Sequence, residues 1–179
     1  GVLDEGADQC SELGCVAVDG AGPAHGHRRG LEAHGLEGRG GVDGGLAFAL
    51  GLGAGAGAVV VVEPTEGRRA IARSNGAIAT TPENARNLLG QLTDGEGADV
   101  VIEAVGSGSV FSGTFDLVRR RGRIVSVGAP TAAEWPIPLS DCFTRELTIS
   151  FAIGDSIRLR PVLLRLIATG MLDPTVVID

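Results

Sequence analysis

The sequence contains an uninterrupted run of β-branched residues, Val59–Val62, that leads directly into an acid, Glu63. A strand that is covered by helices on both faces has no polar face, so its sequence loses the alternation of apolar and polar residues. Pro64 and the pair Arg68 and Arg69 follow within a few residues. The run therefore predicts a buried strand of a parallel sheet, with an acid at its carboxyl end.

Downstream of this run, short apolar segments alternate with amphipathic ones. Helical patterns cover residues 66–74, 82–92, 110–119 and 156–169, and strand patterns cover residues 77–81, 98–105, 123–127 and 147–151. Helices between short buried strands imply right-handed crossovers. The sequence thus predicts an α/β fold with a Rossmann-like, doubly wound parallel sheet.

Glu63 is the first candidate binding residue in this fold. An acid at the carboxyl end of the second strand of a nucleotide-binding βαβ unit receives the adenosine ribose, and a carboxylate there accepts both ribose hydroxyls and repels a 2′-phosphate. This favours NAD over NADP, although the nearby guanidinium of Arg68 offers a site for a phosphate. The alternative interpretation of Glu63 is a solvated acid at the end of a strand.

The first third of the chain has a different character. It holds most of the 29 glycines, and residues 20–45 show no apolar periodicity, which is typical of loops or disorder. We therefore divide the chain into an irregular Gly-rich segment at 1–43 and a Rossmann-type dinucleotide-binding domain at 44–179. Our hypothesis is that much of the first segment is not native sequence, for example because it is translated out of frame.

Composition excludes several classes of partner. The net charge of −7, the pI near 4.9 and an aromatic content of 3% leave no basic surface or stacking platform for nucleic acid. The three cysteines, Cys10, Cys15 and Cys142, form no CxxC pair and indicate neither a disulfide framework nor a thiolate zinc site. The acidic first residues, with no apolar stretch after them, also lack the pattern of a secretory signal. We expect a protein of the reducing cytoplasm.

A transmembrane helix is an alternative for the uncharged run at residues 44–62, which is long enough to span a bilayer. The run is rich in glycine and has no aromatic belt. It also separates into a helix-like half at 46–52 and the strand-like valines, with glycines between them. A helix, a turn and a strand account for the whole run, so no membrane partner is expected.

Five segments in a fixed order carry a resemblance to a known family. They are VVVVEPTEGRR (59–69), GADVVIEAVGS (97–107), GRIVSVGAP (122–130), ELTISFAIG (146–154) and LRPVLLRLIATGMLDP (159–174). Together they resemble the cofactor domain of the zinc-type alcohol dehydrogenase family, the medium-chain dehydrogenases, over about residues 44–179. The resemblance implies an NAD-dependent oxidoreductase acting on an alcohol or polyol, and a homo-oligomer formed through an edge strand such as 147–151.

The resemblance also assigns residues to the two ends of the cofactor. It places Glu63 at the adenosine ribose and Arg68 at the adenine end. The turns after later strands would line the nicotinamide half, where peptide groups bond the carboxamide and small residues permit close approach. These turn residues are Ala104, Val105, Gly106, Val127, Gly128, Ala129, Ala152 and Ile153. Val105 and Val127 would be buried with or without a ligand.

The phosphate-binding turn is the weakest match. A G-x-G-x-x-G motif should follow a first strand and precede the ribose acid by about twenty residues, and our candidates at that distance are Gly40, Gly41 and Gly44. Their spacing departs from the motif, and Asp43 would place a carboxylate beside the pyrophosphate. The alternative, residues 14–23, looks like a strand followed by a GxGP turn but lies too far upstream of Glu63.

The resemblance places the catalytic zinc and the proton relay in a separate, preceding domain, which we expect to be absent from this chain. We therefore predict no catalytic residues and no metal ligands here. His25 and His27 could chelate a metal, but they lie with His34 in the Gly-rich stretch without a cysteine partner at the family spacing.

The sequence predicts an NAD-binding domain that positions the nicotinamide for hydride transfer and is inactive by itself. The alternatives are a non-catalytic dinucleotide-binding module or truncated remnant and, more distantly, a membrane-anchored protein. The residues that would contact the substrate belong mostly to the expected missing domain, so the substrate is not predicted.

Overall fold

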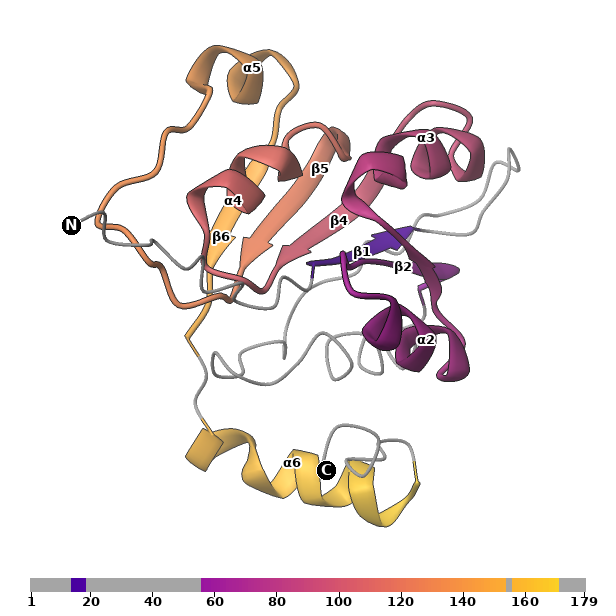
Figure 1. The fold of residues 1–179 in the computed structure, drawn as a ribbon. Coiled ribbons are helices and arrows are strands. Elements are labelled where there is room, and N and C mark those ends of the chain that lie inside the picture. The colour runs from indigo at the N-terminus through magenta and orange to yellow at the C-terminus, as the bar shows by residue number, and fades with distance from the viewer. Residues whose placement is uncertain (1–13, 19–55, 154–155, 171–179) are drawn as a thin grey trace, which may run out of the picture.

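The computed structural model describes residues 14–18, 56–153 and 156–170. Its centre is a six-stranded sheet of order β3-β2-β1-β4-β5-β6 (Figure 1). The strands are β1 Gly14–Val18, β2 Ala58–Val62, β3 Ile78–Thr80, β4 Ala98–Glu103, β5 Val118–Ser126 and β6 Thr148–Phe151. This is the strand order of a doubly wound, Rossmann-type sheet, which confirms the predicted fold class.

The first strand departs from the parallel arrangement. The pairs β2–β3, β4–β5 and β5–β6 are parallel, but β1 runs antiparallel to both of its neighbours, with Val16 opposite Val60 and Val101. A parallel β1 would require a right-handed crossover to β2, whereas an antiparallel strand does not. As a result, Val18 at the end of β1 lies opposite Ala58 at the start of β2.

β1 falls within the segment for which we predict an irregular, Gly-rich chain. The rest of that segment, residues 1–13 and 19–43, lies outside the described residues, as does the helix expected at 46–52. That this segment is not native remains a hypothesis, which resequencing of the coding region would test.

Two helices occupy the positions that the sequence predicts. α2 spans Glu66–Ser74, with Glu66 in its first turn and Arg73 in its last, where each charge is favourable to the helix dipole. The chain leaves α2 through Gly76 at φ 93°, a conformation that glycine adopts without strain. α3 spans Pro82–Leu92 and begins with proline. Proline lacks a backbone N–H, which costs nothing in the first turn because N–H groups there have no partner within the helix.

The valine run is buried from both sides. Val59 and Val61 belong to a cluster with Ala72 of α2, and Val60 belongs to a second cluster with Leu89 of α3. α2 lies on one side of the sheet, while α3 and α4 (Gly108–Thr114) lie on the other (Figure 1). Apolar contacts on both faces explain why the run contains no polar residue, since each buried valine contributes about 1.5–3 kcal/mol.

The boundary between α4 and β5 differs from the prediction. We predict a helix over 110–119, but α4 ends at Thr114 and Val118 already pairs with Ala98. Arg119 donates to Asp99 at 2.6 Å, and Gly122 packs so close to Val118 that a Cβ would lie 2.5 Å from its Cγ2. These long-range contacts, together with a bulge in the pairing with β4, override the local helical composition.

The last elements are α5 Leu139–Thr144, β6 at the edge of the sheet, and α6 Ser156–Ala168. α6 matches the predicted helix and contains Pro161. Among the described helices, none is long and apolar enough to cross a membrane. The valines of the 44–62 run form β2 instead.

The burial of the valine run leads to a stability prediction. Val60→Ala removes two methyl groups from a fully buried side chain and should lower the free energy of unfolding by about 1.5–3 kcal/mol. Val162→Ala on the exposed side of α6 is the matched control and should change it by less than about 0.5 kcal/mol. Urea denaturation followed by circular dichroism measures both, and equal effects would contradict a core position for Val60.

Candidate functional site

The carboxyl ends of the parallel strands meet at one edge of the sheet. Val62 pairs with Thr80, Glu103 pairs with Ser126, and Ser126 in turn pairs with Phe151. The predicted residues that follow these ends, namely Glu63, Ala104, Val105, Gly106, Val127, Gly128, Ala129, Ala152 and Ile153, therefore share this edge. Gly40, Gly41 and Gly44 lie outside the described residues.

Glu63 is fully buried, so it is not a solvated strand-end acid. Its Oε1 accepts a hydrogen bond from the Thr65 N–H at 2.7 Å. Its Oε2 is also buried but has no hydrogen-bond partner within the described part of the chain, and the nearest cation, Nη1 of Arg68, lies 3.9 Å away. A buried carboxylate oxygen without a donor is costly, so this atom is suited to a ligand hydroxyl.

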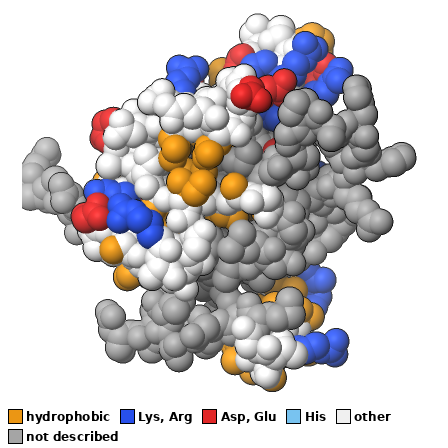
Figure 2. Space-filling view, turned by 90° about the vertical axis from the view of Figure 1, so that its right-hand side faces the viewer, with side chains coloured by type: hydrophobic (Ala, Val, Ile, Leu, Met, Phe, Trp, Pro, Cys, Tyr) orange, Lys and Arg blue, Asp and Glu red, His pale blue; other side chains and the backbone are white. Residues whose placement is uncertain are grey.

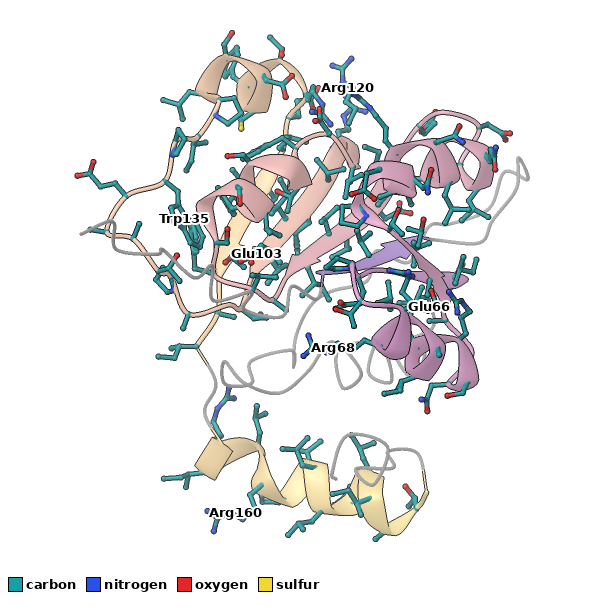
Figure 3. All side chains as sticks on the ribbon, viewed as in Figure 1. Glu66, Arg68, Glu103, Arg120, Trp135 and Arg160 are labelled. Atoms are coloured by element: carbon teal, nitrogen blue, oxygen red, sulfur yellow. The ribbon has the colours of Figure 1, made fainter. Side chains whose placement is uncertain are left out.

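The two neighbouring arginines of α2 differ in their contacts. Arg69 is largely buried, with 12% of its side chain exposed, and its Nη1 donates to the carbonyl oxygens of Glu63 and Pro64 at 2.6 Å each. Arg68 leaves 42% of its side chain exposed, and it extends from α2 in a different direction from Glu66 (Figure 3). Arg69 thus fixes the turn after β2, while Arg68 is accessible beside Glu63.

Glu66 is exposed and accepts hydrogen bonds from Arg69 at 2.7 Å and from Arg73 at 2.9 Å. Hydrogen bonds from Arg73 and Arg69 lower the pKa of Glu66 to about 2. Figure 2 shows acidic and basic side chains side by side on the surface, as expected for such paired charges.

The lowered pKa of Glu66 fixes the sign of a pH effect. Because its folded-state pKa lies below its ordinary value of 4.5, the stabilisation from Glu66 is complete above pH 4.5 and decreases as the pH falls towards 2. Wild type should therefore be more stable than Glu66→Gln at pH 7, and the difference should shrink between pH 4.5 and 2. Thermal melts across this range measure it, and a constant difference would contradict the pairing.

Glu103 is a buried acid that we did not predict as a site residue. Its Oε1 accepts the N–H groups of Val105 and Gly106 at 2.7 and 2.6 Å, and its Oε2 accepts the Ser126 hydroxyl at 2.6 Å (Figure 3). Its carbonyl oxygen accepts the N–H groups of Val127 and Gly128. The sequence does carry a signal for Glu103, because it ends an apolar strand in the same way as Glu63 does.

These bonds change the interpretation of the two turns that follow β4 and β5. The N–H groups of Val105, Gly106, Val127 and Gly128 all donate to Glu103. The close approach that the glycines permit is between the turns themselves, since a Cβ on Gly106 would lie 1.9 Å from the Ala129 carbonyl oxygen. The two turns pack closely against each other and form a surface that we call the shelf. Its four N–H groups donate to Glu103 within the protein.

The remaining predicted residues of this edge lie after β6. The Ala152 N–H donates to the Ser126 carbonyl oxygen at 3.0 Å, which continues the parallel pairing. Ala152 is half-buried, and Ile153 is 88% exposed. Their backbone lies beside the shelf, and the Ile153 side chain is accessible to a ligand.

A cavity of about 350 Å³ opens between α3 and α4, beside the Glu63 turn. Its lining includes the apolar side chains of Val62, Pro64, Pro82, Val105 and Val110, together with the charged residues Arg86, Glu103 and Asp116. Val105, which we assign to the nicotinamide half of a cofactor, thus shares a cavity with Pro64, the neighbour of Glu63. The cavity can accept a flat apolar ring beside Pro64, the residue that follows Glu63.

No cluster of three or more potential metal-ligating side chains occurs in the described ranges 56–153 and 156–170. His25 and His27, the alternative metal ligands, lie outside the described residues, as do His34 and Cys10. Cys142 is a free, half-buried thiol on α5, and burial raises its pKa, which makes it a poor ligand. The described residues therefore do not fit the zinc that the resemblance implies.

The strand order and the acid-bearing edge define an α/β protein of the Rossmann type. Residues 44–169 match the profile of the zinc-binding dehydrogenases. The chain belongs to this family, and the resemblance to zinc-type alcohol dehydrogenases is confirmed.

Individual relatives support the assignment. A probable zinc-binding alcohol dehydrogenase of Mycobacterium tuberculosis is 32% identical over 115 residues, which cover 64% of this chain and 30% of that protein. An L-threonine 3-dehydrogenase of Paraburkholderia xenovorans is 31% identical over 96 residues, covering 50% of this chain and 28% of the relative.

Solved structures give the same result. An alcohol dehydrogenase from Thermus sp. ATN1 has a TM-score of 0.69 and 30% identity, covering 73% of this chain and 39% of its own. A putative zinc-binding dehydrogenase from Sinorhizobium meliloti, bound to NADP, has a TM-score of 0.66 and 26% identity, covering 76% and 41%. The chain thus spans well under half the length of these relatives.

The network around Glu103 leads to a second stability prediction. Glu103→Gln keeps the size of the side chain but turns one acceptor oxygen into an N–H₂ group that faces other donors. The free energy of unfolding should fall by about 1–3 kcal/mol. Glu96→Gln, in the exposed turn after α3, is the control and should have little effect. Urea titration compares them, and an unchanged midpoint for Glu103→Gln would show that the network contributes nothing.

Proposed function

We propose that this chain is the NAD-binding part of a zinc-type alcohol or polyol dehydrogenase and that it orients the nicotinamide for hydride transfer. The observation that supports this most directly is the buried Glu63 carboxylate, whose Oε2 has no hydrogen-bond donor within the described residues. This acid stands at the carboxyl end of β2, where a dinucleotide fold receives the adenosine ribose.

The residues around Glu63 supply complementary interactions. The free Oε2 would accept the ribose hydroxyls, and its charge would repel a 2′-phosphate, which favours NAD. Arg68, accessible at 3.9 Å from that oxygen, would face the adenosine side. The apolar lining at Pro64 and Val105 would hold the adenine ring, so we move Val105 from the nicotinamide half, where the resemblance places it, to the adenosine half of the cofactor.

The nicotinamide half would lie along the shelf of turns. Four N–H groups of these turns already donate to Glu103. We therefore expect the shelf to contact the nicotinamide through its shape and its carbonyl oxygens. The nicotinamide, when bound, carries the hydride. Gly40, Gly41 and Gly44 remain our candidates for the pyrophosphate turn.

One observation favours the alternative of a non-catalytic dinucleotide-binding module or remnant. β1 ends at Val18, opposite the start of β2, and therefore at the edge of the sheet remote from Glu63. In a dinucleotide fold the glycine turn follows the first strand at the cofactor edge. Binding of NAD without turnover of any alcohol would support this alternative.

Self-association is a further proposal for the edge of the sheet. β6 is the last strand in the order and Phe151 on it is exposed, so its backbone groups are available to a second copy of the chain.

The test of the proposed function is NAD binding by the full chain. NAD should raise the melting temperature of wild type, because a ligand that binds the folded state stabilises it. Glu63→Gln should weaken NAD binding by about 10- to 100-fold, the loss expected for a hydrogen bond to a charged group, and should weaken NADP binding less. Isothermal titration measures both affinities.

Glu96→Gln, which removes the same charge at the far side of the molecule, should bind NAD as wild type does. The absence of a melting shift with millimolar NAD would contradict the proposed function and the module alternative alike.

A further inference from the structure

The turn after β2 and helix α2 together carry three arginines and two carboxylates within eleven residues of sequence: Arg68, Arg69 and Arg73 with Glu63 and Glu66. The three cations are not equivalent. Glu66 binds two of them, while the third approaches Glu63. The arrangement bears on how this turn distinguishes a plain adenosine ribose from one that carries a phosphate.

Arg69 and Arg73 are both held by Glu66. Nε and Nη2 of Arg69 donate to Oε2 of Glu66 at 3.1 and 2.7 Å, while its Nη1 is engaged with backbone carbonyls of the turn. Nη1 of Arg73 donates to Oε1 of Glu66 at 2.9 Å. Each oxygen of the Glu66 carboxylate thus accepts a charge-assisted hydrogen bond, and one acid offsets the charge of two guanidinium groups.

Arg68 has a different neighbour. Its Nη1 lies 3.9 Å from Oε2 of Glu63, the oxygen that would accept the ribose. With Glu66 in place, the three cations of this turn and α2 are balanced by two carboxylates, and without Glu66 they would be balanced by one. A phosphate on the ribose carries close to two negative charges at neutral pH, so its binding responds strongly to this change.

We propose that Glu66 is a specificity-determining residue of the cofactor site: by holding Arg69 and Arg73, it withdraws two cations from any 2′-phosphate and strengthens the preference of Glu63 for NAD. This inference rests on the proposed function and extends it to a residue that need not touch the cofactor. Loss of the Glu66 charge should increase affinity for adenosine ligands with a 2′-phosphate and leave the affinity for ligands without one unchanged.

A purely structural role makes a different prediction. Glu66 stands in the first turn of α2 and orients Arg69, which in turn holds the carbonyl oxygens of Glu63 and Pro64. If this were its whole contribution, removal of Glu66 would disturb the turn and weaken both kinds of ligand equally. The ratio of the two affinities therefore separates specificity from positioning.

The experiment titrates 5′-AMP and 2′,5′-ADP into the full chain by isothermal calorimetry. In Glu66→Gln the affinity for 5′-AMP should stay within about twofold of wild type, and the affinity for 2′,5′-ADP should rise by about three- to tenfold at low salt. The gain should shrink as salt is added, because it comes from charges near the surface. Glu96→Gln is the control for loss of a remote negative charge and should change neither affinity.

A second variant, Glu66→Asp, keeps the proposal testable if Glu66→Gln does not fold. Glu66→Asp keeps the charge on a shorter side chain, and we expect its discrimination to stay closer to that of wild type than does that of Glu66→Gln. Melting curves of each variant establish that it is folded before titration.

The outcomes are distinct. Unchanged 2′,5′-ADP affinity in Glu66→Gln, with normal 5′-AMP binding, would overturn the role of Glu66 and leave the proposed function standing. Equal weakening of both ligands would also overturn it, in favour of a positioning role. Failure of wild type to bind 5′-AMP or NAD would overturn the proposed function and this inference together.

Discussion

The hydrogen bonds of Glu103 hold together the edge of the sheet on which the candidate site is built. Its side chain and carbonyl oxygen together accept from four backbone N–H groups and one hydroxyl, and these donors come from the turn after β4 and from β5 with its own turn. Glu63 directly follows β2, one residue beyond the level of Glu103, because Val62 and Glu103 both lie opposite Gly14. One of its carboxylate oxygens has no hydrogen-bond partner among the described residues. One strand-end acid is thus fully hydrogen-bonded and holds two turns together, while the other has a buried carboxylate oxygen with no partner among the described residues.

Local sequence predicted the elements whose boundaries are set locally. α3 begins at Pro82 and α2 ends before the Asn75–Gly76 pair, as the sequence predicts, and the valine run is buried on both faces as its lack of alternation predicts. The α4–β5 boundary was wrong because it depends on partners far along the chain, chiefly the pairing of Val118 with Ala98 and the ion pair of Arg119 with Asp99. The direction of β1 has the same cause, since the composition of five apolar and small residues does not specify which way a strand runs between two neighbours.

The candidate site divides in the same way. Glu63 was predictable because its place after a buried strand follows from chain order alone. The close packing of Gly106 against Ala129 was not predictable. A glycine in a sequence indicates that another group comes close to the backbone, but not whether that group belongs to a ligand or to the protein. The position of Glu103 at the end of an apolar strand was visible in the sequence, but its partners were not, because they lie in its own turn and on the neighbouring strand.

The contact between the turns at Gly106 and Gly128 also bears on protein engineering. A methyl group at either position would enter the backbone of the opposite turn, within 1.9 Å of the Ala129 carbonyl oxygen in one case and 2.1 Å of the Gly106 nitrogen in the other. A mutational library at these two sites would yield few folded members. Positions with an exposed side chain, such as Ile153, are better choices for a library aimed at new cofactor or substrate preferences.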